Sequence, residues 1–70
     1  MEVKVGEKYR HYKGGEYVIV AIAKHSETGE KMVVYKDLYG NEQVWVRPYD
    51  MFTQKVAGKN QEYRFEKIVN

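Results

Sequence analysis

Trp45 and Arg47 are the two residues whose types and spacing point most directly to chemistry. Alternate residues of a β-strand lie on the same side, so a strand over Gln43–Arg47 would place the indole beside the guanidinium. An indole offers a flat apolar surface for stacking, and a guanidinium can hold a carboxylate or a phosphate through two hydrogen bonds. The pair is therefore a candidate site for a planar or extended polar ligand.

The same two residues also have a purely structural interpretation. A chain of 70 residues has a small core, and its one tryptophan could serve to cover a face of the sheet. The aliphatic part of Arg47 would then lie along that face, and an exposed cation–π contact with Trp45 would be worth about 0.5–1 kcal/mol. The solvent exposure of Trp45 distinguishes the two interpretations.

Further aromatic residues could extend this surface. Tyr9 and His11 alternate on one short run, and Tyr35 lies in the middle of another. The predicted ligand-binding groove consists of five residues: Tyr9, His11, Tyr35, Trp45 and Arg47. Three more residues are secondary candidates: His25, Glu27 and Tyr39. Aromatic residues interleaved with basic ones are typical of single-strand nucleic-acid grooves, although here acidic residues alternate with the basic ones.

The two histidines raise a competing hypothesis, a metal-dependent or hydrolytic enzyme that uses His11, His25 and Glu27. A protein metal site normally needs three or four ligands, and neither His-x-x-x-His nor Cys-x-x-Cys occurs in this chain. His25, Ser26 and Glu27 are residue types of a catalytic triad, but adjacent residues of an extended segment point in opposite directions. We therefore expect no metal, no cofactor and no catalytic activity.

Length and charge indicate a single small domain over residues 1–70. The 12 basic and 10 acidic residues are mixed along the chain, without the basic excess of a strong phosphate-binding surface. The longest apolar run, Tyr17–Ala23, is too short to cross a bilayer, and no apolar segment of a signal peptide follows Met1. There is no cysteine, which fits a reducing compartment. We expect a soluble, cytoplasmic protein with no membrane partner.

Glycine-containing turns separate short runs of apolar or alternating residues, the pattern of a small antiparallel sheet. Strands are predicted over Lys8–Tyr12, Tyr17–Ala23, Lys31–Lys36 and Gln43–Arg47. The second of these is apolar on both faces, so we expect it to be central, bent and in contact with two layers of core.

The region after the fourth strand is predicted to start with one helical turn over Pro48–Phe52, because proline fits the first position of a helix. Met51 and Phe52 are expected to close one end of a barrel. Gln54–Val56 and Glu62–Val69 are predicted as a final hairpin. The expected fold is all-β, with five or six antiparallel strands curled into an SH3-like barrel.

Six short blocks follow one another in the order of a known family: Tyr9–Gly14, His25–Thr28, Val33–Tyr35, Leu38–Gly40, Trp45–Pro48 and Met51–Phe52. From about Lys4 to Phe52 the chain closely resembles domain of unknown function family 1653, a group of short bacterial proteins. The resemblance implies a stand-alone, soluble, β-rich protein of SH3-like type and assigns no catalytic residue. It singles out eight positions that match the family pattern: His11, His25, Glu27, Tyr35, Tyr39, Trp45, Arg47 and Pro48.

These observations favour a non-catalytic binding module. Its aromatic groove would supply contact area by stacking, Arg47 would fix the orientation of the ligand, and the partner would be a peptide, a nucleic acid or another polar ligand. A third hypothesis is a structural role, in which an unpaired edge strand joins two copies in a weak homodimer or binds a partner strand.

Overall fold

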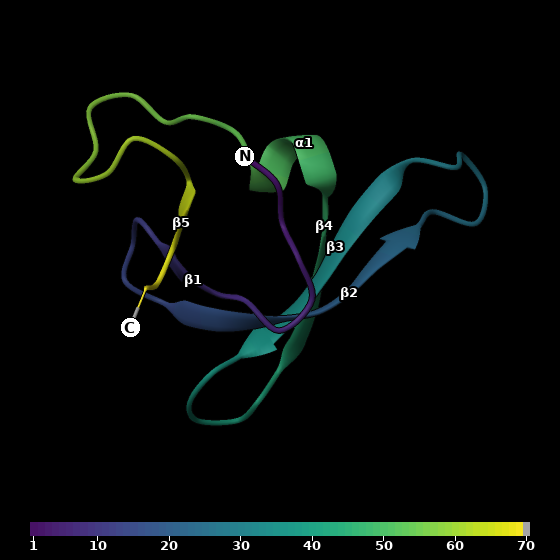
Figure 1. Cartoon of the computed structure of the whole chain (residues 1–70), viewed down its shortest axis with the longest axis horizontal. Helices are drawn as coiled ribbons and strands as arrows, with labels where there is room; N and C mark the ends of the chain where they lie inside the picture. The colour runs from purple at the N-terminus through teal and green to yellow at the C-terminus, as the bar shows by residue number, and fades with distance from the viewer. Residues whose placement is uncertain (70) are drawn as a thin grey trace.

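A computed structural model describes residues 1–69 and shows one curved antiparallel sheet (Figure 1). The strands of this part of the chain are β1 (Lys8–His11), β2 (Glu16–Lys24), β3 (Lys31–Asp37), β4 (Val44–Pro48) and β5 (Phe65–Lys67). Their order across the sheet is β4-β3-β2-β1-β5, so β4 and β5 form its two edges. One helical turn, α1 (Tyr49–Phe52), follows β4.

The all-β class, a strand count of five and the helical turn after Pro48 are confirmed. The sheet is open, because its edge strands β4 and β5 do not pair with each other, and the SH3-like barrel stays a prediction. The predicted final hairpin is reduced to one bridge between Lys55 and Tyr63, and β5 pairs with β1 instead.

The β1–β2 hairpin turns at Gly14, whose φ of 109° is a conformation that residues with a Cβ rarely adopt. β2 lies in the middle of the sheet, as predicted, and its register against β3 shifts between Ile19 and Ala21. Such a bulge bends the strand. The residue at the shift, Val20, is 42% exposed, so the expectation of a second layer of core is wrong: this face of β2 meets solvent.

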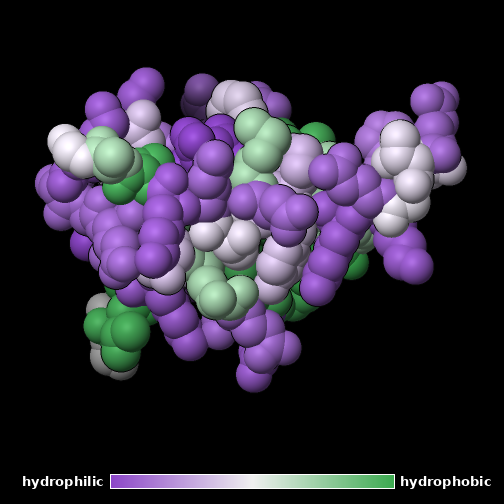
Figure 2. All heavy atoms as spheres, turned by 90° about the horizontal axis from the view of Figure 1, so that it is seen from above, coloured by the Kyte–Doolittle hydropathy of each residue, from purple (hydrophilic) through white to green (hydrophobic). Residues whose placement is uncertain are grey.

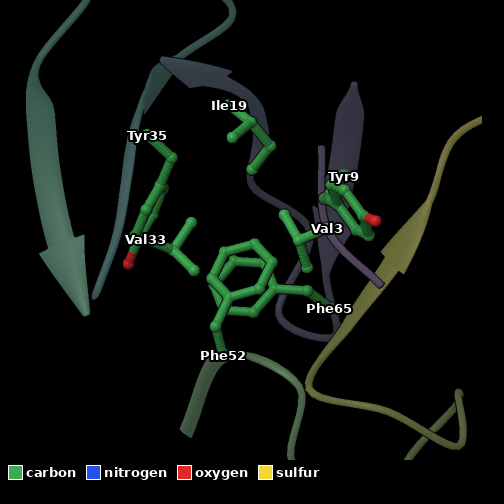
Figure 3. Close-up of a cluster of buried hydrophobic side chains, with 7 residues drawn as sticks. All are labelled: Val3, Tyr9, Ile19, Val33, Tyr35, Phe52 and Phe65. Carbon is green, nitrogen blue, oxygen red and sulfur yellow. The ribbon is translucent and has the colours of Figure 1, made fainter. Parts of the chain in front are cut away.

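The core lies against one face of the sheet, which we call the inner face; the opposite face is the outer face. Seven side chains are buried there, as Figure 3 shows: Val3, Tyr9, Ile19, Val33, Tyr35, Phe52 and Phe65. Phe52 comes from α1 and Phe65 from β5, and their rings stack with centroids 4.0 Å apart. Tyr9 and Tyr35 meet the Phe52 ring edge-on. Large aromatic rings thus provide the buried area that so short a chain needs.

Phe52 closes this core as predicted, whereas Met51 is exposed, so the prediction for Met51 is wrong. Neighbouring residues of one helical turn point in different directions, and α1 can turn only one of the two towards the sheet.

Glu7 connects the N-terminal segment with β1 and β5. Its Oε1 accepts hydrogen bonds from the Lys4 backbone N–H at 2.9 Å and from the Tyr9 hydroxyl at 3.0 Å. Its Oε2 lies 2.8 Å from Nζ of Lys67. The Lys67 contact, followed by the backbone hydrogen bond, lowers the pKa of Glu7 to about 2. The ionised carboxylate therefore fastens β5 to the N-terminal segment and to β1, both of which are far from β5 in the sequence.

Hydrophilic residues predominate on the surface. Figure 2 shows one face on which hydrophobic atoms form small, separate areas among them. Among residues 1–69, no helix is long and apolar enough to cross a bilayer.

Candidate ligand-binding site

A hollow of about 250 Å³ opens beside the core, between β4, β5 and the β1–β2 turn. We call it the aromatic hollow. Its lining comprises eight residues: His11, Lys13, Gly15, Tyr17, Tyr35, Trp45, Arg47 and Phe65. Sites for drug-sized ligands have volumes of roughly 300–1,000 Å³. The aromatic hollow therefore suits one side chain or one ring of a larger ligand.

Four of the five predicted groove residues line this hollow: His11, Tyr35, Trp45 and Arg47. The register of β3 and β4 explains part of this arrangement, because Tyr35 lies opposite Trp45 and Val33 lies opposite Arg47. Trp45 and Arg47 therefore extend the row of inner-face side chains beyond the core. The Trp45 side chain is not part of the core, since the residue is 48% exposed.

Tyr9, the fifth predicted groove residue, does not line the aromatic hollow. It is 1% exposed, and its ring lies edge-on to Phe52, as seen in Figure 3. Burial and the hydrogen bond to Glu7 raise the pKa of its hydroxyl. Tyr9 shares a strand face with His11, but α1 and the N-terminal segment cover the Tyr9 end of that face. The residue is part of the core.

Arg47 is the most distinctive group in the aromatic hollow. Its guanidinium carbon lies 5.3 Å from the centroid of the Phe65 ring, so its cation–π partner is Phe65 rather than Trp45, the partner that the sequence allowed. The ion pairs within residues 1–69 involve other side chains, and Arg47 has no carboxylate partner there. A half-buried guanidinium without a carboxylate partner offers its N–H donors to a ligand.

Trp45 is held in place by a hydrogen bond. Its indole Nε1–H donates to Oδ1 of Asp37 at 3.0 Å. This bond fixes the plane of the ring beside Tyr35, its partner across the two strands. About half of the residue is exposed, so part of the indole is accessible for stacking at the rim of the aromatic hollow.

His11 supplies a second donor. The backbone N–H of Lys13 donates to its Nδ1 at 3.1 Å, so the ring proton of the neutral imidazole resides on Nε2. The imidazole stacks on Tyr12 and meets Phe65 edge-on. These contacts hold the ring at the wall of the hollow.

The aromatic hollow has a positive electrostatic character. The pKa of His11 is lowered, chiefly by burial. The positive charges of Arg47, Arg64 and Lys13 lower it further. Among residues 1–69, none of those that line the hollow carries a carboxylate. An anionic group that entered would meet several cations and the uncharged imidazole of His11.

A second hollow of about 480 Å³ adjoins the first and has acidic walls. Its lining comprises Gly14, Gly15, Glu16, Tyr17, Asp37 and Tyr39. The two hollows share Gly15 and Tyr17. Tyr39, a secondary candidate, lies here and is 72% exposed. A ligand that crossed Tyr17 would pass from basic to acidic surroundings, so we call the second space the acidic hollow.

Tyr17 forms the wall between the two hollows, and the sequence analysis did not identify it. Its ring meets Tyr35 edge-on, with centroids 5.2 Å apart. A Cβ atom at residue 15 would lie 2.5 Å from the Tyr17 hydroxyl, so only glycine lets the ring lie across the turn. Burial, and next the charge of Asp37, raises the pKa of Tyr17. The signal that could have identified Tyr17 in the sequence is its place opposite Tyr9 in a hairpin that turns at the glycines.

Phe65 and Lys13 were also missed. Phe65 reaches the hollow because β5 pairs with β1, and no local pattern in the sequence indicates that pairing. Lys13 was not among the predicted site residues, although it lines the aromatic hollow. Its basic side chain beside the aromatic run Tyr9–Tyr12 was the one clue.

The other secondary candidates, His25 and Glu27, lie in the β2–β3 turn and far from the aromatic hollow. Nδ1 of His25 accepts hydrogen bonds from the backbone N–H groups of Glu27 and Thr28, at 3.1 and 3.4 Å. β2 separates this turn from His11 by roughly 25 Å, at the usual rise per residue. Within the described part of the chain, no three potential metal ligands come together. The structure thus does not assemble His11, His25 and Glu27 into one site.

Fold and site together define a small all-β protein with an aromatic, positively charged hollow beside its core. The model of a family described as "Protein of unknown function (DUF1653)" matches residues 7–67, and the chain belongs to this family. The match includes β5, which lies beyond the stretch whose resemblance was visible in the sequence. No curated protein and no solved structure matches the chain.

Proposed function

We propose that this protein is a non-catalytic binding module that receives an acidic side chain of a peptide in the aromatic hollow. The observation that carries the proposal is the Arg47 guanidinium, which is half-buried against Phe65 and has no carboxylate partner among residues 1–69. Charged groups removed from water are normally paired. A ligand carboxylate would provide the missing partner and two parallel hydrogen bonds.

The neighbouring groups complete a recognition scheme for one acidic residue of the peptide. Nε2–H of His11 is a second donor for the same ligand carboxylate. The aliphatic part of the ligand's acidic side chain would lie between the rings of Tyr35 and Trp45. The next residue of the peptide would cross Tyr17 into the acidic hollow, where Asp37 favours a basic side chain. The preferred ligand is therefore an acidic residue followed by a basic one.

A peptide fits these surroundings better than a nucleic acid. A phosphate backbone that continued from the aromatic hollow would approach the carboxylates of Glu16 and Asp37 in the acidic hollow. The chain has a net charge of only +2, and the volume beside Arg47 suits a single side chain. Strong nucleic-acid binding usually relies on a larger basic surface.

Binding is proposed in preference to catalysis because the groups considered for catalysis, His11, His25 and Glu27, are separated along β2. A metal-dependent or hydrolytic reaction would need them to converge. A cytoplasmic location and a bacterial source stay predictions from the sequence.

The test uses the fluorescence of Trp45, the only tryptophan in the chain, during titration with a blocked Gly-Asp-Lys-Gly peptide. We expect saturable binding, and Arg47→Gln should weaken it at least about tenfold, because charge-assisted hydrogen bonds contribute about 1.5–3 kcal/mol. Lys36→Gln is the matched control. It removes one positive charge from a residue that pairs with Glu42 and lines neither hollow, and it should leave the affinity unchanged.

Two results would contradict the proposal. The first is an Arg47→Gln variant that binds the peptide as tightly as the unaltered protein. The second is equal weakening by Lys36→Gln, which would indicate attraction by overall charge. Tighter binding of a short oligothymidylate than of the peptide would favour a nucleic-acid ligand instead.

A further inference from the structure

The edge strand β4 has a free side that the binding proposal does not use. β4 pairs with β3 on one side, and no other strand of the described chain pairs with it. Natural edge strands are usually protected by charged side chains, prolines, bulges or very short length. β5, the other edge, is three residues long, whereas β4 has five residues and carries protection only at its end, in Arg47 and Pro48.

The hydrogen bonds of β3 and β4 identify which backbone groups face outward. The Asp37 N–H donates to the Gln43 carbonyl oxygen at 2.9 Å, so residues 43, 45 and 47 direct their backbone groups towards β3. Val44 and Val46, one residue out of phase, direct their N–H and C=O groups away from the sheet. Pro48 belongs to the same outward set, where its lack of an N–H group costs nothing.

The side chains along this edge are also exposed and apolar. Val44 is 53% exposed and Val46 is 61% exposed, both on the outer face, and Trp45 lies between them on the inner face. Three consecutive large apolar residues at a free edge would favour pairing with another strand.

We propose that β4 pairs with β4 of a second copy of this chain, antiparallel and centred on Trp45. The occupant is argued from the sequence of the edge, because Val44-Trp45-Val46 reads the same in both directions. A twofold axis at Trp45 places Val44 of one copy opposite Val46 of the other, and the reverse. Each strand of the pair therefore lies opposite the same Val-Trp-Val sequence that it carries itself.

This register satisfies the outward backbone groups. Val44 and the opposite Val46 exchange two hydrogen bonds, and the twofold axis doubles them to four. The two Trp45 residues face each other in the closer, non-hydrogen-bonded position, where aromatic cross-strand pairs are favourable. The next positions, Gln43 opposite Arg47, bring no like charges together. Pairing ends beyond them, because Pro48 lacks a donor and Glu42 has a left-handed φ of 54°.

The dimer is weak by this account. Stable interfaces bury roughly 1,600 Å² in total, and a pair of five-residue strands covers much less than that. The association therefore depends on protein concentration, and it joins two sheets into one while leaving each Arg47 on its own inner face.

The test is sedimentation equilibrium of the full chain from about 10 µM to about 1 mM, a range suited to a weak association. We expect the average mass to rise from 8.3 kDa towards twice that value. Val46→Pro should stay monomeric at every concentration, because the substitution removes an outward N–H that β3 does not use. Val20→Lys, which replaces another exposed valine away from the edge, is the control and should associate like the unaltered chain.

Hydrogen exchange gives a second, site-specific readout. The amides of Val44 and Val46 should exchange rapidly in dilute solution and become protected at high concentration. Val44→Lys should prevent this protection and serves as a second edge variant if Val46→Pro does not fold. A constant mass of 8.3 kDa at the highest concentration overturns the proposal, as does association that both edge variants leave unchanged. Protection only on addition of another protein's strand would assign the edge to a different partner.

Discussion

Phe65 should contribute to both stability and ligand binding, whereas its stacking partner Phe52 should contribute to stability alone. Both rings are buried, and they stack with centroids 4.0 Å apart. Phe65 also lies beneath the Arg47 guanidinium and lines the aromatic hollow, and Phe52 does neither. Replacing each by leucine keeps an apolar side chain of similar size and removes the ring. The two variants form a matched pair.

The expected loss of stability follows from the ring contacts. Phe65 approaches the rings of Phe52, His11, Tyr35 and Tyr17, and Phe52 approaches three rings. An aromatic pair contributes about 0.5–1.5 kcal/mol beyond burial, and neighbouring pairs are not additive. We expect either leucine variant to lower the free energy of unfolding by about 2 kcal/mol. The melting temperature should fall by roughly 8–16 °C in a domain of this size.

Ligand binding should separate the two variants. A cation–π contact is worth about 0.5–1 kcal/mol, so Phe65→Leu should weaken peptide binding about two- to fivefold. Phe52→Leu should leave the affinity unchanged. Urea denaturation followed by circular dichroism measures stability, and Trp45 fluorescence measures binding below the melting transition. The reasoning is refuted if Phe52→Leu weakens binding as much as Phe65→Leu, or if Phe65→Leu changes stability by less than about 0.5 kcal/mol.

Three further substitutions test the contacts of Glu7 and of the glycine turn. In the folded protein the pKa of Glu7 is lowered from 4.5 to about 2, so its contribution is complete above pH 4.5 and is lost as the pH falls towards 2. Glu7→Gln should therefore lower the free energy of unfolding by roughly 1–2 kcal/mol at neutral pH. The urea midpoints of the variant and of the unaltered protein should converge near pH 2. Midpoints that stay equally far apart at every pH would contradict this. Gly14→Ala should lower stability by about 1–2 kcal/mol in the same denaturation assay, with binding intact, because its positive φ is strained with a Cβ. Gly15→Ala should instead displace the Tyr17 ring and change peptide affinity, and a Tyr17 NMR signal that does not move would disprove the contact.

The strands were predictable because their signals are local. Glycine turns and two-residue alternation located β1 to β4 to within one or two residues, and Pro48 marked the helical turn. The same alternation placed Trp45 and Arg47 on one face, where the structure has them. The position of Tyr35 opposite Trp45 also follows from a simple hairpin between the third and fourth strands.

The remaining features depend on contacts between distant parts of the chain. β5 has three residues and pairs with β1, and nothing near Phe65 in the sequence indicates that partner. Tyr9 and His11 share a strand face, but the N-terminal segment and Phe52 cover only Tyr9. The segments that pack on a strand face decide which of its residues become core. The alternation of residues within the strand does not indicate where those segments lie. The choice between Met51 and Phe52 has the same origin, since it depends on how α1 meets the sheet.

The most direct test of the central claim is the NMR signal of the Arg47 Nε–H group during titration with the blocked Gly-Asp-Lys-Gly peptide. If Arg47 binds the peptide carboxylate, this signal should shift and saturate together with the indole N–H of Trp45, and replacing Asp by Asn in the peptide should abolish the shift. An Arg47 signal that stays in place while the peptide binds would contradict the account.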